Sequence, residues 1–228
     1  MFGIVLKEYL GLIKGVKSIL VILFVTSVSI LAAQYASSST FLAEAAGGSQ
    51  GTELAGLSFI FILFGALFIY ILSHDIVNRD IELQRIRLLI TKTSRRNVII
   101  GKFISVFAFW ASVTLITFAC ISISTQTFHI TPLIVLWVFI AFHSGVAIMM
   151  STIITKHSYT VLISLIGGLV IPGVGIWSLF NKTVIANILS YALPYYIAMD
   201  DYRFIALTVV EVALMLIISI IVFERKEL

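Results

Sequence analysis

The chain has 228 residues, of which 60% are hydrophobic and 11% are charged, and its formal net charge at pH 7 is +4. A soluble globular domain carries about 25% charged residues, so this composition excludes a soluble protein and indicates that lipid is the solvent for most of the chain. The basic residues lie beside apolar segments rather than in a basic domain of their own, which argues against a nucleic-acid partner.

Residues 1–17 are predicted to form an amphipathic helix that lies on the membrane surface. At 100° per residue, Lys7 and Lys14 fall on one side of the helix, whereas Val5 and Leu12 fall on the other. This two-sided pattern is typical of interfacial helices. The alternative is the basic start of a signal peptide, which would need no organised apolar face.

Six apolar segments follow, and each is close to the ~20 residues that a helix needs to cross ~30 Å of hydrocarbon. They are residues 18–33, 55–72, 103–123, 133–154, 160–179 and 204–223. The sequence therefore predicts an all-α membrane protein in which residues 1–228 form a single transmembrane domain.

The distribution of Lys and Arg predicts the orientation of these segments. Of the 15 basic residues, 13 lie on flanks that would share one side of the membrane and 2 lie on the opposite flanks. The positive-inside rule then places both termini and the loop 75–102 in the cytoplasm. We expect a multi-pass protein of a bacterial cytoplasmic (inner) membrane.

The outer segment 180–203 is too short to cross the membrane twice and too apolar to be a free loop. Short re-entrant helices that dip into the outer leaflet fit it best.

The loop 75–102 is the most charged part of the chain, with 7 of the 15 Lys and Arg residues. Its front half has a helix-like pattern, and Thr93-Ser94 supplies a possible N-cap for a helix that starts at Arg95. Two interpretations stay open here. The loop is a contact site for a soluble partner, or its charges only satisfy the positive-inside rule and touch lipid phosphates.

The order of residues in this loop resembles that of ABC-2-type transporter permeases. In that family a Glu precedes a Leu-Leu pair, a Pro-x-Ser-Arg turn and a Gly-Lys at the foot of the third span. The matching residues here are Glu82, Arg87-Leu88-Leu89, Ser94-Arg95 and Gly101-Lys102. The N-terminal interfacial helix, the six spans and the re-entrant segment before the last span follow the same family layout.

Two positions depart from the family pattern. A Gly-Thr often precedes the Leu-Leu run, and here those positions are Gln84-Arg85; the Pro of the turn is Lys92. These changes concern the subfamily and the local turn shape more than the overall layout.

The resemblance implies that residues 75–102 form a coupling element in a groove of a separate ATP-binding subunit. The residues that it implies as contacts are Asp80, Glu82, Arg85, Arg87, Ser94, Arg95 and Arg96. The chain carries no P-loop motif, so ATP and Mg²⁺ would be bound by an ABC-type ATPase partner, and this chain would be no enzyme and need no cofactor. Six spans would also require a second permease subunit, either an identical copy or a paralogue.

Four residues inside the spans are candidates for a pathway or gate. Glu211 lies about two turns into the last span, where a charged group costs about 2.5–3.5 kcal/mol on insertion scales. Gly168, Pro172 and Gly173 interrupt the fifth span. For each of these residues a functional role and plain helix packing both remain open.

The histidines predict neither an active site nor a metal site. His143 lies mid-span without a nucleophile motif, so we interpret it as a hydrogen-bonding residue between packed helices. His74, His129 and His157 lie near both ends of the spans, a distribution that suggests no metal cluster.

Together these features predict a permease subunit of an ATP-driven ABC exporter. Its substrate would be hydrophobic or amphipathic, such as an antimicrobial peptide. The alternative is a non-transporting membrane anchor or sensor that recruits a cytoplasmic partner through the same basic loop. An intramembrane enzyme is disfavoured because no catalytic motif is present.

Overall fold

The structure is a computed structural model that describes residues 2–36, 52–126, 128–181, 183–195 and 205–226. In this part of the chain every regular element is helical and no strand occurs. The helices are α1 (Phe2–Lys14), α2 (Val16–Ala36), α4 (Thr52–Ile60), η1 (Phe61–Gly65), α5 (Ala66–Ser73), α6 (Asn78–Glu82), α7 (Arg85–Lys92), α8 (Arg95–Thr125), α9 (Ile130–Ile153), α10 (His157–Phe180), α11 (Val184–Ala192) and α12 (Ile205–Glu224).

Six helical segments are long and apolar enough to cross a membrane, which confirms the predicted number and order of spans. They are Val16–Gln34, Gly56–Glu82, Arg95–Thr125, Ile130–Ile153, His157–Phe180 and Ile205–Glu224. By length and composition, the chain has the helices of a multi-pass membrane protein.

The third span is longer than predicted. Its helix starts at Arg95, so the last eight residues of the predicted loop belong to α8. Ser94 is its N-cap, as its position in the sequence predicts, and the Ser94 Oγ accepts a hydrogen bond from the Asn97 N–H at 3.3 Å. The end of the predicted loop and the third span therefore form one continuous helix from Arg95 onward.

The second span contains a feature that the sequence did not predict, a π-helical turn at Phe61–Gly65. The Phe61 ring packs edge-on against Trp110 of α8, with 5.8 Å between the ring centroids. A Cβ on Gly65 would lie 2.9 Å from the Phe61 ring. The wider turn thus accommodates the Phe61 ring beside Gly65, which has no side chain. Such π-helical turns frequently mark functional sites.

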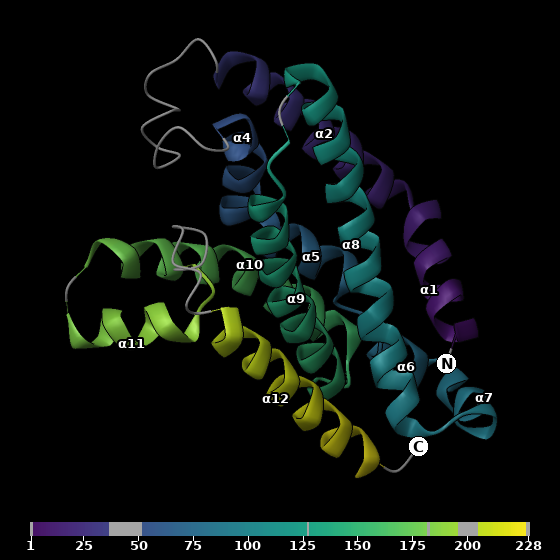
Figure 1. Cartoon of the computed structure of the whole chain (residues 1–228). Coiled ribbons are helices and arrows are strands. Elements are labelled where there is room, and N and C mark those ends of the chain that lie inside the picture. Colours follow the sequence, from purple (N-terminus) through teal and green to yellow (C-terminus); the bar gives the residue numbers. More distant parts are fainter. Residues whose placement is uncertain (1, 37–51, 127, 182, 196–204, 227–228) are drawn as a thin grey trace.

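The central helix of the bundle is α9, which packs against α5, α8 and α12 (Figure 1). In the most apolar stretch of each helix, 61% of the residues are buried in α9 but only 17% in α12 and 22% in α2. Most of the buried apolar side chains form one hydrophobic cluster. The helices α2, α10 and α12 therefore present most of their apolar surface to the surroundings, which suits contact with lipid or another subunit.

The N-terminal helix α1 packs on the outside of the bundle against α8. The Tyr9 hydroxyl donates to the Ser112 Oγ at 3.1 Å, and the Ser105 Oγ donates to the Val5 carbonyl at 3.2 Å. No residue of α1 is fully buried. One side of α1 thus faces α8 and the other is open, and its location on a membrane surface stays a prediction.

Within the predicted outer segment 180–203, the described residues form one short helix, α11. The Thr183 Oγ1 caps it by accepting from the Ala186 N–H at 3.3 Å. The helix runs beside α10 (Figure 1) and exposes Val184, Ile185 and Ile188. Residues 196–203 lie outside the described residues, and the predicted dip into the outer leaflet remains a prediction.

Candidate coupling site at the basic end

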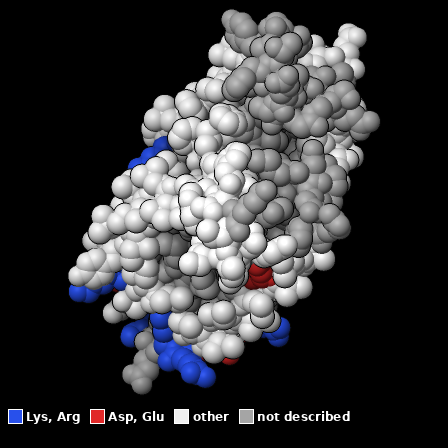
Figure 2. Space-filling model, turned by 90° about the vertical axis from the view of Figure 1, so that its left-hand side faces the viewer, with Lys and Arg blue, Asp and Glu red and all other residues white. Residues whose placement is uncertain are grey.

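Lys and Arg side chains gather at one end of the molecule, where both termini, α6 and α7 also lie (Figures 1 and 2). We call this the basic end, and residues 75–102 within it the charged segment. The charged segment comprises a turn after α5, the short helices α6 and α7, and the first two turns of α8. It is the candidate functional site because it is both exposed and connected to several spans.

The two short helices of the charged segment are separated by a tight turn at Leu83 and Gln84. Gln84 has a φ of 55°, in the left-handed region that favours glycine. The turn reverses the chain, and Ile86 on α7 is 1% exposed and packs into the core. The pair is therefore a helix–turn–helix element that is anchored to the bundle on one side.

The start of this element is fixed to two spans. The backbone N–H groups of Val77 and Asn78 donate to the Ser151 Oγ of α9 at 3.0 and 3.2 Å. The Asn78 side-chain amide also donates to the Thr160 Oγ1 of α10. Because Asn78 is fully buried, these bonds are shielded from water and hold the turn firmly.

The outer surface of the charged segment carries most of the predicted contact residues. Glu82, Arg85, Arg87, Ser94 and Arg96 are exposed. Leu83 at the turn is also 49% exposed. This mixture of charge with one apolar side chain is a surface that a protein partner can bind, since interface centres are apolar and their rims polar.

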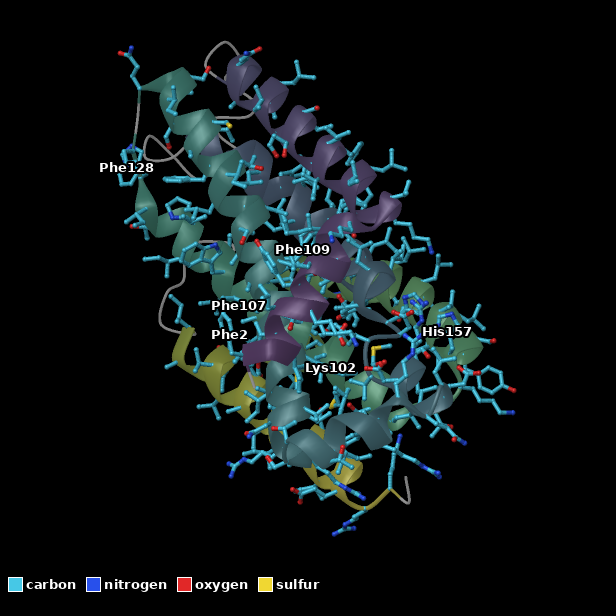
Figure 3. The ribbon with its side chains drawn as sticks, turned by 90° about the vertical axis from the view of Figure 1, so that its right-hand side faces the viewer. Phe2, Lys102, Phe107, Phe109, Phe128 and His157 are labelled. Atoms are coloured by element: carbon cyan, nitrogen blue, oxygen red, sulfur yellow. The ribbon has the colours of Figure 1, made fainter. Side chains whose placement is uncertain are left out.

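Asp80 differs from the other predicted contacts because its side chain points into the protein. Its Oδ2 lies 2.5 Å from the Nζ of Lys102, which is fully buried on α8. The Glu8 Oε1 of α1 lies 3.2 Å from the same Nζ, and the Ile76 carbonyl accepts a further hydrogen bond. We call Lys102, Asp80 and Glu8 the ion triad (Figure 3 labels Lys102).

The ion triad joins three elements, α1, α6 and α8, around one buried cation. Breaking such a buried pair by removing one partner costs about 3–5 kcal/mol, because the remaining charge is left uncompensated. The sequence hinted at Lys102 through the Gly101-Lys102 motif, but it gave no means of pairing it with Asp80 and Glu8, which lie far away along the chain. Lys102 is thus a site residue that sequence reasoning did not single out.

Arg95 connects the charged segment to the C-terminal helix. Its guanidinium donates to the carbonyl oxygens of Glu224 and Lys226 at 2.8 and 2.9 Å, and more weakly to that of Phe223 at 3.4 Å. A cation at the C-terminus of α12 also interacts favourably with the helix dipole. Arg95 therefore holds the C-terminal end of α12.

Lys226 extends this connection to α9. Its ammonium donates to the carbonyl of Thr152, near the end of α9. Partial burial lowers the pKa of Lys226 from its ordinary value, because desolvation disfavours the charged form. The ends of α8, α9 and α12 are thereby linked by polar contacts at the basic end.

A cleft of about 570 Å³ opens between α1 and the charged segment. Its walls carry charges of both signs, from Lys7, Glu8, Lys17, Asp75, Arg79, Asp80 and Arg85. The cleft lies directly beside the ion triad, so a molecule or protein segment that enters it would meet Glu8 and Asp80.

The four predicted gate residues do not converge on one place. Gly168 and Pro172 are buried on α10. A Cβ on Gly168 would lie 2.7 Å from the Leu67 Cα, whereas a Cβ on Gly173 would meet nothing within 4 Å. Glu211 is half-buried on α12, and its Oε2 has no hydrogen-bond partner. The main packing partners of α10 are α5 and α11, and those of α12 are α8 and α9.

Pro172 lies inside α10, which continues unbroken from His157 to Phe180. Arg203, the basic residue nearest to Glu211 in the sequence, lies outside the described residues. A gate formed by these four residues therefore remains a prediction, and for Gly168 the geometry indicates close packing.

His143 forms the inter-helix hydrogen bond that its mid-span position predicts. Its Nδ1 lies 2.9 Å from the Tyr70 hydroxyl of α5, and the rings of Phe139, Phe142 and Tyr195 surround it. This confirms the interpretation of His143 as a packing residue.

No protein-family model and no curated protein matches the chain. The geometry itself shows an exposed helix–turn–helix element whose buried side is tied to α1, α8, α9, α10 and, through Arg95, α12. Such an element can pass a displacement at its surface to most of the bundle.

Proposed function

We propose that this chain is the permease subunit of an ATP-driven exporter of the ABC-2 type. A separate ABC-type ATPase would bind the exposed side of the charged segment on the cytoplasmic face of a bacterial cytoplasmic membrane. The observation that carries the proposal is the charged segment itself, which is exposed on one side and bonded to several spans on the other. ATP and Mg²⁺ would be bound by the partner.

The proposed coupling follows the polar contacts of the basic end. Closure of the ATPase would push α6 and α7, and the displacement would reach α1 and α8 through the ion triad. It would reach α9 and α10 through Asn78, and α12 through Arg95. Buried polar contacts suit this role because they have a defined geometry and are costly to leave half-made.

The outward apolar faces support a second subunit and an apolar substrate. The helices α2, α10 and α12 are mostly exposed, so two permease copies or a pair of paralogues would have ample surface to associate in the membrane. An apolar groove of about 340 Å³ lies between α8, α9 and α12. A hydrophobic or amphipathic molecule, such as an antimicrobial peptide, is the substrate class that these surfaces fit.

Co-purification with a charge-reversed variant tests this proposal. In Arg85→Glu/Arg87→Glu, the reversed charges lie on the exposed side of α7, so an ATPase that binds the parent chain should be lost. The matched control Lys14→Glu/Arg225→Glu makes the same change in net charge at exposed positions outside the charged segment. It should retain the ATPase.

The partner's identity decides between transporter and anchor. A stoichiometric P-loop ATPase that is lost only from the Arg85/Arg87 variant supports the exporter, and its ATP hydrolysis should rise when the parent chain is present. Recovery of the chain with a partner that has no P-loop would replace the exporter with a non-transporting anchor or sensor. Equal ATPase recovery with both variants would mean that the charged segment is not the binding site of the ATPase.

A further inference from the structure

Three potential metal ligands from distant parts of the sequence meet at the basic end. His74 and Asp75 lie in the turn after α5, and His157 is the first residue of α10. One donor atom from each residue lies within 4.8 Å of the other two. The two imidazole rings are 5.1 Å apart and tilted by 33°, and His157 lies to the right of Lys102 in Figure 3.

The hydrogen bonds of His74 fix which of its nitrogens is free. Its Nδ1 lies 2.8 Å from the Ile71 carbonyl, which can only accept, so the Nδ1 carries the proton. The Nε2 then has a free lone pair, and it is buried without a hydrogen-bond partner. His74 is only 8% exposed, so no bulk water compensates this nitrogen. An imidazole whose other nitrogen donates to a backbone carbonyl has the arrangement of metal-bound histidines.

His157 presents a second buried nitrogen to the same place. Its Nδ1 is buried without a hydrogen-bond partner and lies 4.0 Å from the Asp75 Oδ2. A buried polar atom without a partner is unusual and costs about 1–3 kcal/mol. His74 and His157 thus each have a buried nitrogen without a partner, and each residue brings a donor atom within 4.8 Å of a donor atom of the other and of Asp75. This arrangement points to one shared cation.

We propose that His74, Asp75 and His157 form a binding site for a divalent transition-metal ion, with Zn²⁺ as the best-fitting ion. Two imidazoles and a carboxylate are the ligands that zinc accepts in three-residue sites, which leave a fourth position open. They also suit zinc better than Mg²⁺ or Ca²⁺, which prefer oxygen ligands.

Binding requires a small contraction of the three side chains. Ligand atoms about 2.1 Å from a tetrahedral zinc lie about 3.4 Å from each other. The donor atoms would therefore close by up to about 1.4 Å from the observed 4.8 Å. The His157 side chain is 40% exposed and follows extended residues, so it has room to move.

Arg79 is the competitor for Asp75 in this site. Its Nη1 lies 3.5 Å from the Asp75 Oδ2, but its side chain is 64% exposed. The exposed guanidinium can withdraw into water at little cost, since surface ion pairs contribute about 0–1 kcal/mol. Removing its charge should favour the metal.

His74 and Asp75 also line the cleft between α1 and the charged segment. A bound ion would fasten the start of the charged segment to the N-terminus of α10, beside the Asn78–Thr160 hydrogen bond. This role does not depend on which partner binds the exposed side of the charged segment.

Titration of the purified full chain with Zn²⁺ tests the proposal. In detergent micelles and after chelator treatment, calorimetry should show one Zn²⁺ per chain. Co²⁺ should give the intense visible absorption of a non-octahedral site.

His157→Ala should weaken Zn²⁺ binding by about tenfold or more, because the loss of even an outer-shell partner of a metal site typically weakens binding by at least that factor. Arg79→Gln should strengthen Zn²⁺ binding. The matched control His129→Ala removes an exposed histidine outside the cluster and should bind as the parent does.

Hydrogen exchange gives a second readout, which is independent of the calorimetry. Zn²⁺ should slow amide exchange in residues 74–78 and 157–160 of the parent chain, and this protection should disappear in His157→Ala. Unchanged affinity in His157→Ala, equal weakening in His129→Ala, or failure of the folded parent chain to bind Zn²⁺ would each overturn the site.

Discussion

The basic end and the glycine positions of α10 pack against their neighbours through different kinds of contact. At the basic end, charged and polar side chains such as Lys102, Arg95 and Asn78 bond to groups on neighbouring helices. Along α10, glycines let neighbours approach: a Cβ on Gly168 would lie 2.7 Å from the Leu67 Cα, and one on Gly175 would lie 2.3 Å from the Tyr195 ring.

This difference indicates how each region can respond to a force. A buried polar contact has a preferred distance and direction, so helices that share one are displaced together. A contact between a glycine and an apolar side chain has no preferred direction, so it resists compression but permits sliding. We therefore expect the basic end to transmit movement, and the glycine positions of α10 to accommodate it.

The largest expected effect is that of Lys102→Met. The substitution leaves Asp80 and Glu8 without their shared cation in a largely buried position, and we expect a loss of about 3–5 kcal/mol in the free energy of unfolding. Unfolding by SDS titration in mixed micelles measures it. Lys14→Met, at an exposed position of α1, should change stability by less than about 0.5 kcal/mol.

The double variant Lys102→Met/Asp80→Asn separates the ion triad from a simple size effect. Because it neutralises one of the two stranded carboxylates, it should be more stable than Lys102→Met alone. If both variants are equally unstable, the charges of the triad are not what holds α6 to α8.

The next largest effect is expected on α10. Gly168→Ala would place a methyl group against the Leu67 backbone, which cannot rotate away, so we expect a loss of about 1–3 kcal/mol. Gly173→Ala has open space around its Cβ and should stabilise the helix by about 0.5–1 kcal/mol. Thermal unfolding in detergent measures both, and effects of equal sign would contradict the packing described for α10.

A smaller effect is expected for Arg95. Arg95→Gln removes the cation that binds the last carbonyls of α12, which should cost about 1 kcal/mol since the site is partly exposed. Arg96→Gln changes the exposed neighbour and should leave stability within about 0.5 kcal/mol. Proteolysis of the C-terminus should accelerate in Arg95→Gln only; equal cleavage in the two variants would mean that Arg95 does not hold α12.

Much of the fold could be predicted because each span carries its own signal. Runs of about 20 apolar residues define the spans without reference to neighbours, and all six were found at the expected places. Ser94 was predictable for the same reason, since an N-cap is recognised from residues within one turn. The same N-cap predicted a helix that starts at Arg95, and the structure adds that this helix continues without a break into the third span.

The parts of the site that could not be predicted depend on pairs of residues far apart in the sequence. Lys102 meets Glu8, and His74 meets His157, only after the helices pack. The sequence placed His74 and His157 near span ends but contained no information on which ends are adjacent. The exposure of Arg85 and Arg87 could be expected from their charge, whereas the inward position of Asp80 could not.

The smallest effect is expected at the turn between α6 and α7, and it bears most directly on the family resemblance. Gln84 has a φ of 55°, a conformation that costs a non-glycine residue about 1–3 kcal/mol. Glycine adopts it freely but loses more entropy on folding, by about 0.5–1 kcal/mol. Gln84→Gly should therefore stabilise the chain slightly, by about 0.5 kcal/mol.

Gln126, at the C-terminus of α8, has the same φ of 55° and is the matched control. Gln126→Gly should give a similar gain in stability. Under the proposed function, only Gln84→Gly, which lies in the charged segment, should alter ATPase stimulation. The resemblance to ABC-2-type permeases implies a glycine often at the position of Gln84, and a glycine relieves the left-handed turn without changing its direction. If Gln84→Gly loses stability while Gln126→Gly gains it, the Gln84 side chain itself stabilises the turn. The glycine that the resemblance implies at this position would then not suit the turn of this chain.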